Sequence, residues 1–416
     1  MKVAMIAPIP PHWGGGQKWR GGGVATHVQG LLPALADLGV AIRLLADNAP
    51  RAQVRAPDLP GVTVAGMAQT PGSLARLGLR RALRLTARLA RSAEIRRLVP
   101  PAQLARFWGQ AVNFDHFLAA APYDVLHVQQ AQHRQFLCQQ WLGVTGPLVA
   151  TVQSANELIR PNFPWLIPLM LANFQRAHHL IAVSAYVRAR LLAAGAPEER
   201  ISVIPNGVDE RLFTPALPAD ARARLGLPPD GFIVLYTGHL IPRKGVDVLL
   251  HAFAQALGAQ PQARLALVGG GPEQARLAQL AAELGVADRT LFPGYQSFPD
   301  MPAWYQACDV FVMASWAEGL SLSVLEALAC GRPVITTRPD MGEHDAVIPG
   351  ETGWLVDYGD VAGLAQALRE AADSAETRLT LGQAARHLAE THFTWPRIAR
   401  ATLAVYHRSL PNHPTL

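Results

Sequence analysis

The chain has 416 residues, of which 50% are hydrophobic and 16% charged, a composition that excludes an intrinsically disordered protein. Its length suggests two or three domains of about 100–200 residues. The formal net charge is +6, and the three cysteines (Cys138, Cys308 and Cys330) lie far apart in sequence. We therefore expect neither a disulfide scaffold nor a cysteine zinc site, but a protein of the reducing cytosol.

The N-terminal residues MKVAMIAPIP are typical of a buried strand rather than of a signal peptide, because two prolines precede any cleavage pattern. The most apolar stretch, Phe163 to Phe174, is 12 residues long and contains two prolines. A membrane-spanning helix needs about 20 apolar residues. The sequence therefore predicts a cytoplasmic protein that does not cross a membrane.

Short apolar strands alternate with helical stretches in the first half of the chain. A strand over Val3–Pro8 is followed by a glycine-rich loop, Gly14–Gly23, and by a helix over Val24–Leu38. Further strands are expected at Val40–Leu45, Val125–Val128, Leu148–Val152 and Leu180–Val183. This alternation is typical of a parallel sheet that helices cover on both faces. It predicts a Rossmann-like α/β domain over residues 1–204.

Positive charge is concentrated between Pro71 and Arg106, where nine arginines and one glutamate give +8, so the remaining 380 residues sum to −2. On a helical wheel most of these arginines fall within an arc of about 140° opposite a row of leucines, which predicts a basic amphipathic helix near residues 74–98. Two interpretations stay open: a solvent-exposed face of a packed helix, or a docking surface for anionic lipid or a polyanionic acceptor. No aromatic residues interleave with the arginines, which argues against nucleic acid as a partner.

After a proline-rich segment, the second half of the chain shows the same alternation of strands and helices. Five prolines between residues 205 and 230 predict a linker. Strands are then expected at Phe232–Thr237, Arg264–Val268, Val310–Met313 and Val334–Thr337, and helices at Gly245–Ala259, Pro272–Leu284 and Leu322–Ala329. The pattern predicts a second Rossmann-like domain over 231–394, with ligands at the carboxyl ends of its strands and against helix N-termini.

Two carboxylates, Glu318 and Glu326, flank a turn and the start of a helix in the segment EGLSLSVLE. Carboxylates accept charge-assisted hydrogen bonds from sugar or ribose hydroxyls. The free N–H groups that follow a turn such as Gly319–Ser321 can hold an anion. The spacing of the two glutamates alone does not distinguish a ligand-binding pair from two exposed residues on a helix. The neighbouring sequence is needed to choose between these interpretations.

The stretch SWAEGLSLSVLEALACGRPV (315–334) resembles the donor-site segment of the retaining GT-B glycosyltransferases of family four, also called glycosyl transferases group 1. That family has two glutamates separated by seven intervening residues and an Ala-Cys-Gly-x-Pro-Val run after them. Four further segments are similar to the family: GHLIPRKG (238–245), SVIPNGVD (202–209), LVGGGP (267–272) and GGV (22–24). The resemblance covers most of the chain. It implies two Rossmann-like domains that face across a cleft, with the acceptor on the first and the donor on the second, and a terminal helix (395–416) that returns to the first domain.

The resemblance implies roles for individual residues. Lys244 would neutralise the donor diphosphate as the sugar–phosphate bond breaks, Glu326 would bind the ribose hydroxyls, and Glu318 would bind the transferred sugar. Gly22 and Gly23 would let the backbone approach the phosphates. The implied donor-binding set, in which Lys244 and Glu318 also count as catalytic, comprises Gly22, Gly23, His239, Lys244, Glu318, Gly319, Leu320, Ser321 and Glu326. No metal ion or other cofactor is expected, because no Asp-x-Asp pair stands in a suitable loop.

Three positions depart from the family pattern. His239 replaces an arginine five residues before Lys244, and histidine offers fewer donors and only partial charge at neutral pH. Gln129 and Gln153 replace histidines at two acceptor-side positions. His127 is retained and His133 lies near enough in sequence to substitute. Both histidines are therefore catalytic candidates, against the alternative of packed or surface histidines.

The resemblance implies transfer of a hexose-type sugar from a UDP- or GDP-sugar to an acceptor hydroxyl, with retention of anomeric configuration. The acceptor would be a saccharide or a lipid-linked molecule of cell-envelope, polysaccharide or glycolipid synthesis. If the arginine face is a docking surface, the segment Arg76–Arg91 would bring the enzyme to the inner face of an anionic membrane. Two alternatives stay open: a non-catalytic subunit that binds nucleotide-sugar within a glycosyltransferase complex, and a sugar-nucleotide epimerase. A nicotinamide dehydrogenase is disfavoured, because no G-x-G-x-x-G directly follows a strand.

Overall fold

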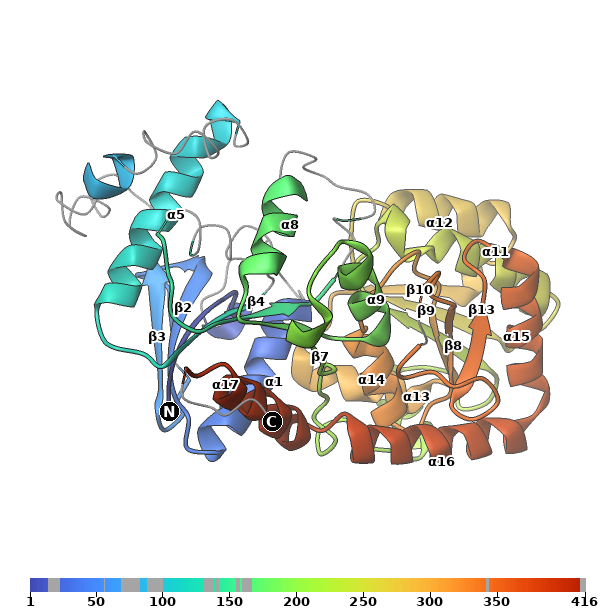
Figure 1. The fold of residues 1–416 in the computed structure, drawn as a ribbon. Helices are drawn as coiled ribbons and strands as arrows, with labels where there is room; N and C mark the ends of the chain where they lie inside the picture. The colour runs from blue at the N-terminus through green and yellow to red at the C-terminus, as the bar shows by residue number, and fades with distance from the viewer. Residues whose placement is uncertain are drawn as a thin grey trace. The chain divides into compact units, whose positions relative to one another are not determined.

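The computed structural model of the chain describes residues 1–13, 23–55, 57–68, 83–87, 100–129, 138, 142–154, 158, 167–341 and 344–411. The chain divides into two compact units (Figure 1). The first unit consists of Met1–Pro205 together with Trp395–Leu416, and the second of Asn206–Thr394.

The first unit is built on a seven-stranded parallel sheet with the order β3-β2-β1-β4-β5-β6-β7. Its strands are β1 (Lys2–Ala7), β2 (Ala41–Pro50), β3 (Val62–Met67), β4 (Val125–Gln129), β5 (Leu148–Val152), β6 (His179–Ala182) and β7 (Ile201–Val203). Every residue of β4 and β5 is buried, as expected for central strands with both faces covered. The strand order reverses between β1 and β4, which confirms the predicted Rossmann-like fold.

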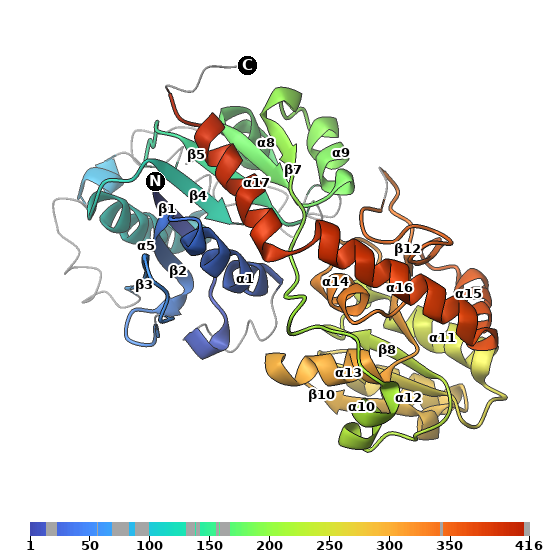
Figure 2. The same cartoon turned by 90° about the horizontal axis from the view of Figure 1, so that it is seen from below.

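Helices α1 (Gly23–Asp37) and α17 (Trp395–Arg408) lie side by side in the first unit (Figure 2). Gly30 permits this contact, because a Cβ at that position would lie 2.0 Å from the Trp395 ring. Apolar residues of α17, such as Ile398, join the core that contains Met5 and Ile42. Further helices in the described part of this unit are α5 (Pro101–Ala119), α8 (Ile167–Arg176), α9 (Ala185–Ala193) and the short 3-10 helices η1 (Pro11–Trp13) and η5 (Glu198–Arg200).

The predicted basic helix near 74–98 is described only over residues 83–87, which are helical. Arg84 is exposed and Leu85 is buried there, as the amphipathic pattern predicts. Leu83, expected on the apolar side, is instead 59% exposed. The other arginines of the predicted Arg76–Arg91 face lie outside the described residues.

The second unit is built on a six-stranded parallel sheet with the order β10-β9-β8-β11-β12-β13. Its strands are β8 (Ile233–Thr237), β9 (Arg264–Val268), β10 (Thr290–Gly294), β11 (Val310–Met313), β12 (Val334–Thr337) and β13 (Gly353–Val356). Its helices are α10 (Pro218–Leu225), α11 (Val246–Leu257), α12 (Gln274–Glu283), α13 (Met301–Ala307), α14 (Leu322–Ala329), α15 (Val361–Asp373) and α16 (Ala375–His392), with η6 (Pro242–Lys244), η7 (Ala287–Arg289) and η8 (Phe298–Asp300). The order again reverses between the first and fourth strands, β8 and β11, which confirms a second Rossmann-like unit.

The segment predicted to be a linker, 205–230, is instead a packed part of the second unit from Asn206 onwards. Pro218 begins α10, where a missing N–H costs no intrahelical hydrogen bond. Arg222 on α10 is 5% exposed, donates to the Ala307 carbonyl at 3.0 Å and pairs with Asp309 at 2.7 Å. A buried guanidinium needs such partners, and they hold α10 against α13. None of the helices in the described part of the chain has the length and hydrophobicity that a membrane crossing needs.

Candidate functional site

The predicted donor-site residues of the second unit lie near the point where the strand order of its sheet reverses. Strand β8 ends at Thr237 and continues into residues 238–245, and its neighbour β11 ends at Met313 and continues into residues 314–321. Loops that follow the two strands at such a reversal form the ligand crevice of doubly wound sheets. His239, Lys244 and Glu318 therefore share one edge of this sheet, although they are up to 79 residues apart in the sequence.

Gly245 fixes these two loops against each other. Its φ is +62°, and a Cβ there would lie 2.1 Å from the Ala314 carbonyl oxygen. The Trp316 N–H donates to the Arg243 carbonyl at 2.8 Å, which adds a direct backbone bond between the loops. Only glycine tolerates both the left-handed backbone and the close contact. The loop that carries Lys244 is therefore locked beside the loop that carries Glu318.

Lys244 and Arg243 converge on one oxygen of Glu318. Lys244 Nζ lies 2.7 Å and Arg243 Nη1 2.8 Å from Glu318 Oε1, and Arg243 Nη1 also donates to the Ala317 carbonyl at 2.6 Å. Burial alone would raise the pKa of Glu318, but the charges of Lys244 and Arg243 outweigh it and lower this pKa to about 2. The cluster thus holds two cations and one carboxylate at neutral pH, with one positive charge in excess.

Glu326 reaches the same edge of the sheet through Tyr305. The buried Tyr305 hydroxyl, on α13, donates to Glu326 Oε2 at 2.6 Å and lies 2.8 Å from Thr237 Oγ1, at the end of β8. Burial raises the pKa of Glu326 to about 7, although the hydrogen bond from Tyr305 acts in the opposite direction. The Glu326 carboxyl group therefore changes its charge near neutral pH, whereas that of Glu318 does not.

The other predicted donor residues of the second unit lie in the same two loops or at the start of α14. The His239 ring packs edge-on against the Tyr295 ring, with centroids 5.9 Å apart. Gly319 and Leu320 lead into Ser321, the N-cap residue of α14, and the Leu320 carbonyl accepts a 2.8 Å hydrogen bond from the buried Asn206 side chain. The structure thus brings His239, Lys244, Glu318 and the turn before α14 to one edge of the sheet.

His127, a predicted catalytic residue, is fully buried in the first unit. Its Nδ1 lies 2.6 Å from the Tyr406 hydroxyl and its Nε2 lies 2.8 Å from Thr151 Oγ1. Burial, with a smaller contribution from His27, lowers the pKa of His127 to about 3. The neutral imidazole, with both nitrogens in hydrogen bonds, links β4 and β5 to α17. These contacts favour the interpretation of His127 as a packed histidine.

The acceptor-side candidates Gln129 and Gln153 stand at the carboxyl ends of the neighbouring strands β4 and β5. Gln129 is fully buried, with its Nε2 3.4 Å from His127 Nε2, and Gln153 is half-buried. Gly23 is the first residue of α1. Gly22 and His133 lie outside the described residues.

Two residues of this site were missed by the sequence analysis. Arg243 is inside the GHLIPRKG segment, but among the basic residues of that segment only His239 and Lys244 were given roles. Tyr305 lies 21 residues before Glu326, and nothing in the sequence pattern connects the two. For Arg243, the available sequence signal was its position directly before Lys244. For Tyr305 there was no such signal, because its contact with Glu326 depends on how α13 packs.

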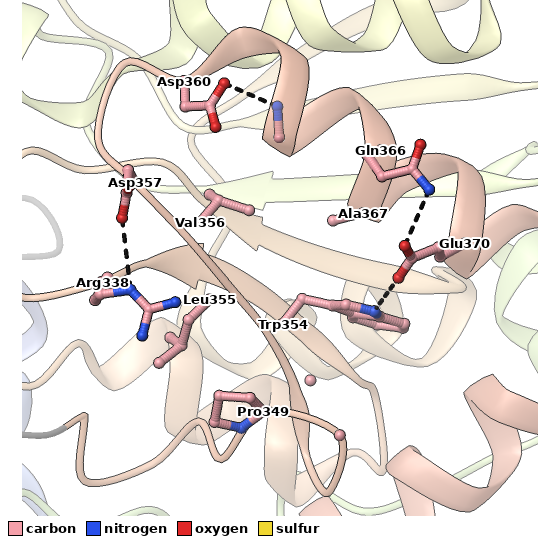
Figure 3. Close-up of a pocket in the computed structure, with 13 residues that line it drawn as sticks. Arg338, Pro349, Trp354, Leu355, Val356, Asp357, Asp360, Gln366, Ala367 and Glu370 are labelled. Atoms are coloured by element: carbon pink, nitrogen blue, oxygen red, sulfur yellow. Dashed lines mark hydrogen bonds and ion pairs between the residues drawn. The ribbon is translucent and has the colours of Figure 1, made fainter.

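A shallow pocket of about 330 Å³ lies elsewhere in the second unit, along the last strand of the sheet, β13, and beside α15 (Figure 3). Its polar side chains pair among themselves: Arg338 Nε lies 3.5 Å from Asp357 Oδ1, and Trp354 Nε1 donates to Glu370 at 3.0 Å. Neither Lys244 nor either glutamate of the motif lines it. This pocket is therefore separate from the predicted donor site.

Comparison with known proteins settles the family. Residues 219–388 match the family described as glycosyl transferases group 1, and residues 21–212 match glycosyltransferase family 4. A D-inositol 3-phosphate glycosyltransferase of Thermobispora bispora is 31% identical over 419 residues, which cover 94% of this chain and 92% of that protein. The chain belongs to glycosyltransferase family 4.

Two more proteins show what this family 4 glycosyltransferase is similar to. The sucrose-phosphate synthase of Thermosynechococcus elongatus superposes with a TM-score of 0.78 at 25% identity, over 98% of both chains. A GDP-mannose-dependent alpha-(1-6)-phosphatidylinositol monomannoside mannosyltransferase of Mycolicibacterium smegmatis is 35% identical over 224 residues, which cover 51% of this chain and 58% of that protein. The GT-B fold and the glycosyltransferase class predicted from the sequence are both confirmed.

Proposed function

We propose that this glycosyltransferase moves a hexose from a nucleoside diphosphate sugar to an acceptor hydroxyl with retention of configuration. The supporting observation is the cluster of Lys244 and Glu318 at the strand-order reversal, with Glu326 tied to the same edge through Tyr305. A diphosphate leaving group gains negative charge as its bond to the sugar breaks. A half-buried lysine held in place before the reaction stabilises that charge better than water does.

The proposed step needs no side-chain base. The bond between the anomeric carbon and the diphosphate oxygen breaks, the acceptor oxygen bonds to the same face of that carbon, and the acceptor proton passes to the leaving diphosphate. The proposal agrees with the burial of His127 and with glutamine at position 129, because neither side chain has to remove a proton. Glu318, ionised at neutral pH, accepts hydrogen bonds from hydroxyls of the transferred sugar.

The acceptor is proposed from the names of the relatives. One acts on inositol 3-phosphate and another on a phosphatidylinositol monomannoside, and the latter is GDP-mannose-dependent. We therefore propose a polyol, saccharide or lipid-linked acceptor of cell-envelope, polysaccharide or glycolipid synthesis. The donor base is proposed to be uracil or guanine.

The first test is slow hydrolysis of a panel of UDP-, GDP-, ADP- and dTDP-sugars, followed by proton NMR with and without EDTA. We expect one donor to be hydrolysed at the same rate in EDTA, because the proposed charge stabilisation comes from side chains. From an α-linked donor the free sugar should be released first as the α-anomer. Initial release of the β-anomer would contradict retention, and no binding of any donor would contradict the donor site itself.

A non-catalytic subunit that binds nucleotide-sugar is the second candidate, favoured by the replacement of the family's arginine by His239. It predicts donor binding without sugar release, even with a broad acceptor panel that includes inositol 3-phosphate and with a candidate partner protein present. Transfer to any acceptor by the isolated chain would exclude it.

The arginine-rich segment between Pro71 and Arg106 predicts binding to anionic membranes. Each basic residue near such a surface contributes about 1 kcal/mol, and the attraction falls off within a Debye length. We expect the protein to sediment with vesicles that contain phosphatidylglycerol, to stay in the supernatant with pure phosphatidylcholine vesicles, and to be released by high salt. Binding that is independent of lipid charge and salt would contradict this prediction.

A further inference from the structure

Arg243 belongs to the same charged cluster as Lys244 and Glu318, at a position to which the family motif gives no role. Its Nη1 and Lys244 Nζ lie 2.8 and 2.7 Å from the same Glu318 oxygen, so the two cationic groups already converge on one anionic atom. Arg243 is 31% exposed and Lys244 is 13% exposed, so solvent, and hence an anionic ligand, can reach both. One positive charge remains in excess when Glu318 is ionised.

His239 occupies the position that the family fills with an arginine. The His239 ring packs against Tyr295, whose hydroxyl donates to the Gly270 carbonyl at 3.0 Å. The backbone carbonyl of His239 accepts a hydrogen bond from the Tyr236 hydroxyl at 2.9 Å. An imidazole is shorter than a guanidinium and has neither its permanent charge nor its fork of donors. If two permanent cations are to neutralise the diphosphate, the second must therefore come from a residue other than His239.

We propose that Arg243 is the second diphosphate-binding cation and takes the role of the arginine that His239 replaces. The inference rests on the proposed nucleoside diphosphate sugar donor. Arg243 uses Nη1 for its bonds to Glu318 and Ala317, and within the described residues its Nη2 and Nε have no hydrogen-bond partner. These donors are available to phosphate oxygens. A phosphate oxygen that contacts Lys244 comes within reach of the guanidinium, because Glu318 holds the two groups together.

The test is calorimetric titration of UDP, GDP and inorganic pyrophosphate into the unaltered protein and the variant Arg243→Gln. We expect the variant to bind pyrophosphate and the preferred nucleoside diphosphate about 10- to 100-fold more weakly, the usual effect of losing hydrogen bonds to a charged group. Binding of the matching nucleoside without phosphates should not change. A merely structural role would weaken nucleoside binding as well, and that result would overturn the proposal.

The decisive variant is the double substitution His239→Arg with Arg243→Gln, which moves the arginine to the position that the family uses. We expect it to recover most of the lost diphosphate affinity, because a guanidinium again faces the phosphates. Failure to recover any of it would overturn the replacement role. Arg188→Gln is the matched control: Arg188, on α9 in the first unit, is 36% exposed and paired with Glu198, and its loss should leave affinity unchanged.

Failure of the proposed function would look different from failure of this inference. If the unaltered protein binds none of the three probes, the donor site itself is wrong and both proposals fall. If it binds them and Arg243→Gln binds them equally well, only the role of Arg243 is wrong. Far-ultraviolet circular dichroism and thermal unfolding of each variant show whether the fold is intact.

Discussion

Lys244→Ala should lower turnover of the nucleotide-sugar by about 10²–10³-fold, the effect of removing one group that stabilises charge in the transition state. Lys244 Nζ is held 2.7 Å from Glu318 on a loop that Gly245 locks in place, so no rearrangement is needed when the diphosphate becomes more negative. Binding of the nucleoside alone should change little, because the lysine faces the phosphates in the proposed site. Donor hydrolysis rates and nucleoside affinity measure the two effects separately.

The fold should survive this substitution, because Arg243 remains 2.8 Å from Glu318 and keeps its carboxylate paired. Lys244→Arg is the informative control, since it keeps the positive charge and should retain more activity than alanine. Equal losses in turnover and in nucleoside affinity would instead indicate a collapse of the loop. Unchanged turnover in Lys244→Ala would remove the proposed stabilisation of the leaving group.

The strands and helices around the site could be predicted because their signals are local. Strand β8 is an apolar run that ends at Thr237, and Arg264–Val268 and Leu322–Ala329 match β9 and α14. The segment over 205–230 was predicted wrongly for the opposite reason. Its prolines are compatible with a linker and equally with the first position of a helix, and the contact that decides, Arg222 with Asp309, joins residues 87 apart in sequence.

In the candidate site, too, some residues could be predicted from the sequence, whereas those that depend on distant contacts could not. Resemblance to the family motifs brought out Lys244, Glu318 and Glu326, because a motif records which residues share a ligand even when they are far apart in the chain. The environment of His127 was not predictable, since its partner Tyr406 is 279 residues away on the returning helix α17. Tyr305 was missed because its hydroxyl reaches Glu326 only after α13 has packed on the sheet.

Glu326→Ala should weaken donor binding by about 10- to 100-fold at pH 8, because the ribose hydroxyls lose a charge-assisted acceptor. The loss of donor affinity in Glu326→Ala should depend on pH. Burial raises the pKa of Glu326 to about 7, so the free protein gains the carboxylate form only as the pH rises through that value. Donor affinity of the unaltered protein should therefore increase between pH 6 and pH 8, measured by titration with an intact nucleotide-sugar whose phosphates do not titrate in this range.

Three variants separate this effect from other titrations. Glu326→Gln should show weak binding that no longer depends on pH near 7, and Tyr305→Phe should move the transition to higher pH, because the hydroxyl of Tyr305 lowers the pKa of Glu326. Tyr406→Phe removes another buried tyrosine hydroxyl, in the first unit, and should leave the transition where it is. A pH dependence that persists in Glu326→Gln would assign the titration to another group.

Protein stability should show the opposite trend with pH, which gives an independent check. The pKa of Glu326 is higher in the folded protein, about 7, than its ordinary value of 4.5, so between these values the folded state retains a proton that the unfolded state has lost. The contribution of Glu326 to the free energy of unfolding therefore falls as pH rises from about 4.5 to 7. Glu326→Gln should remove this decline in denaturant titrations without donor. Because donor binding requires the carboxylate that folding disfavours, the same charge is costly to the empty protein and useful only when ribose is bound.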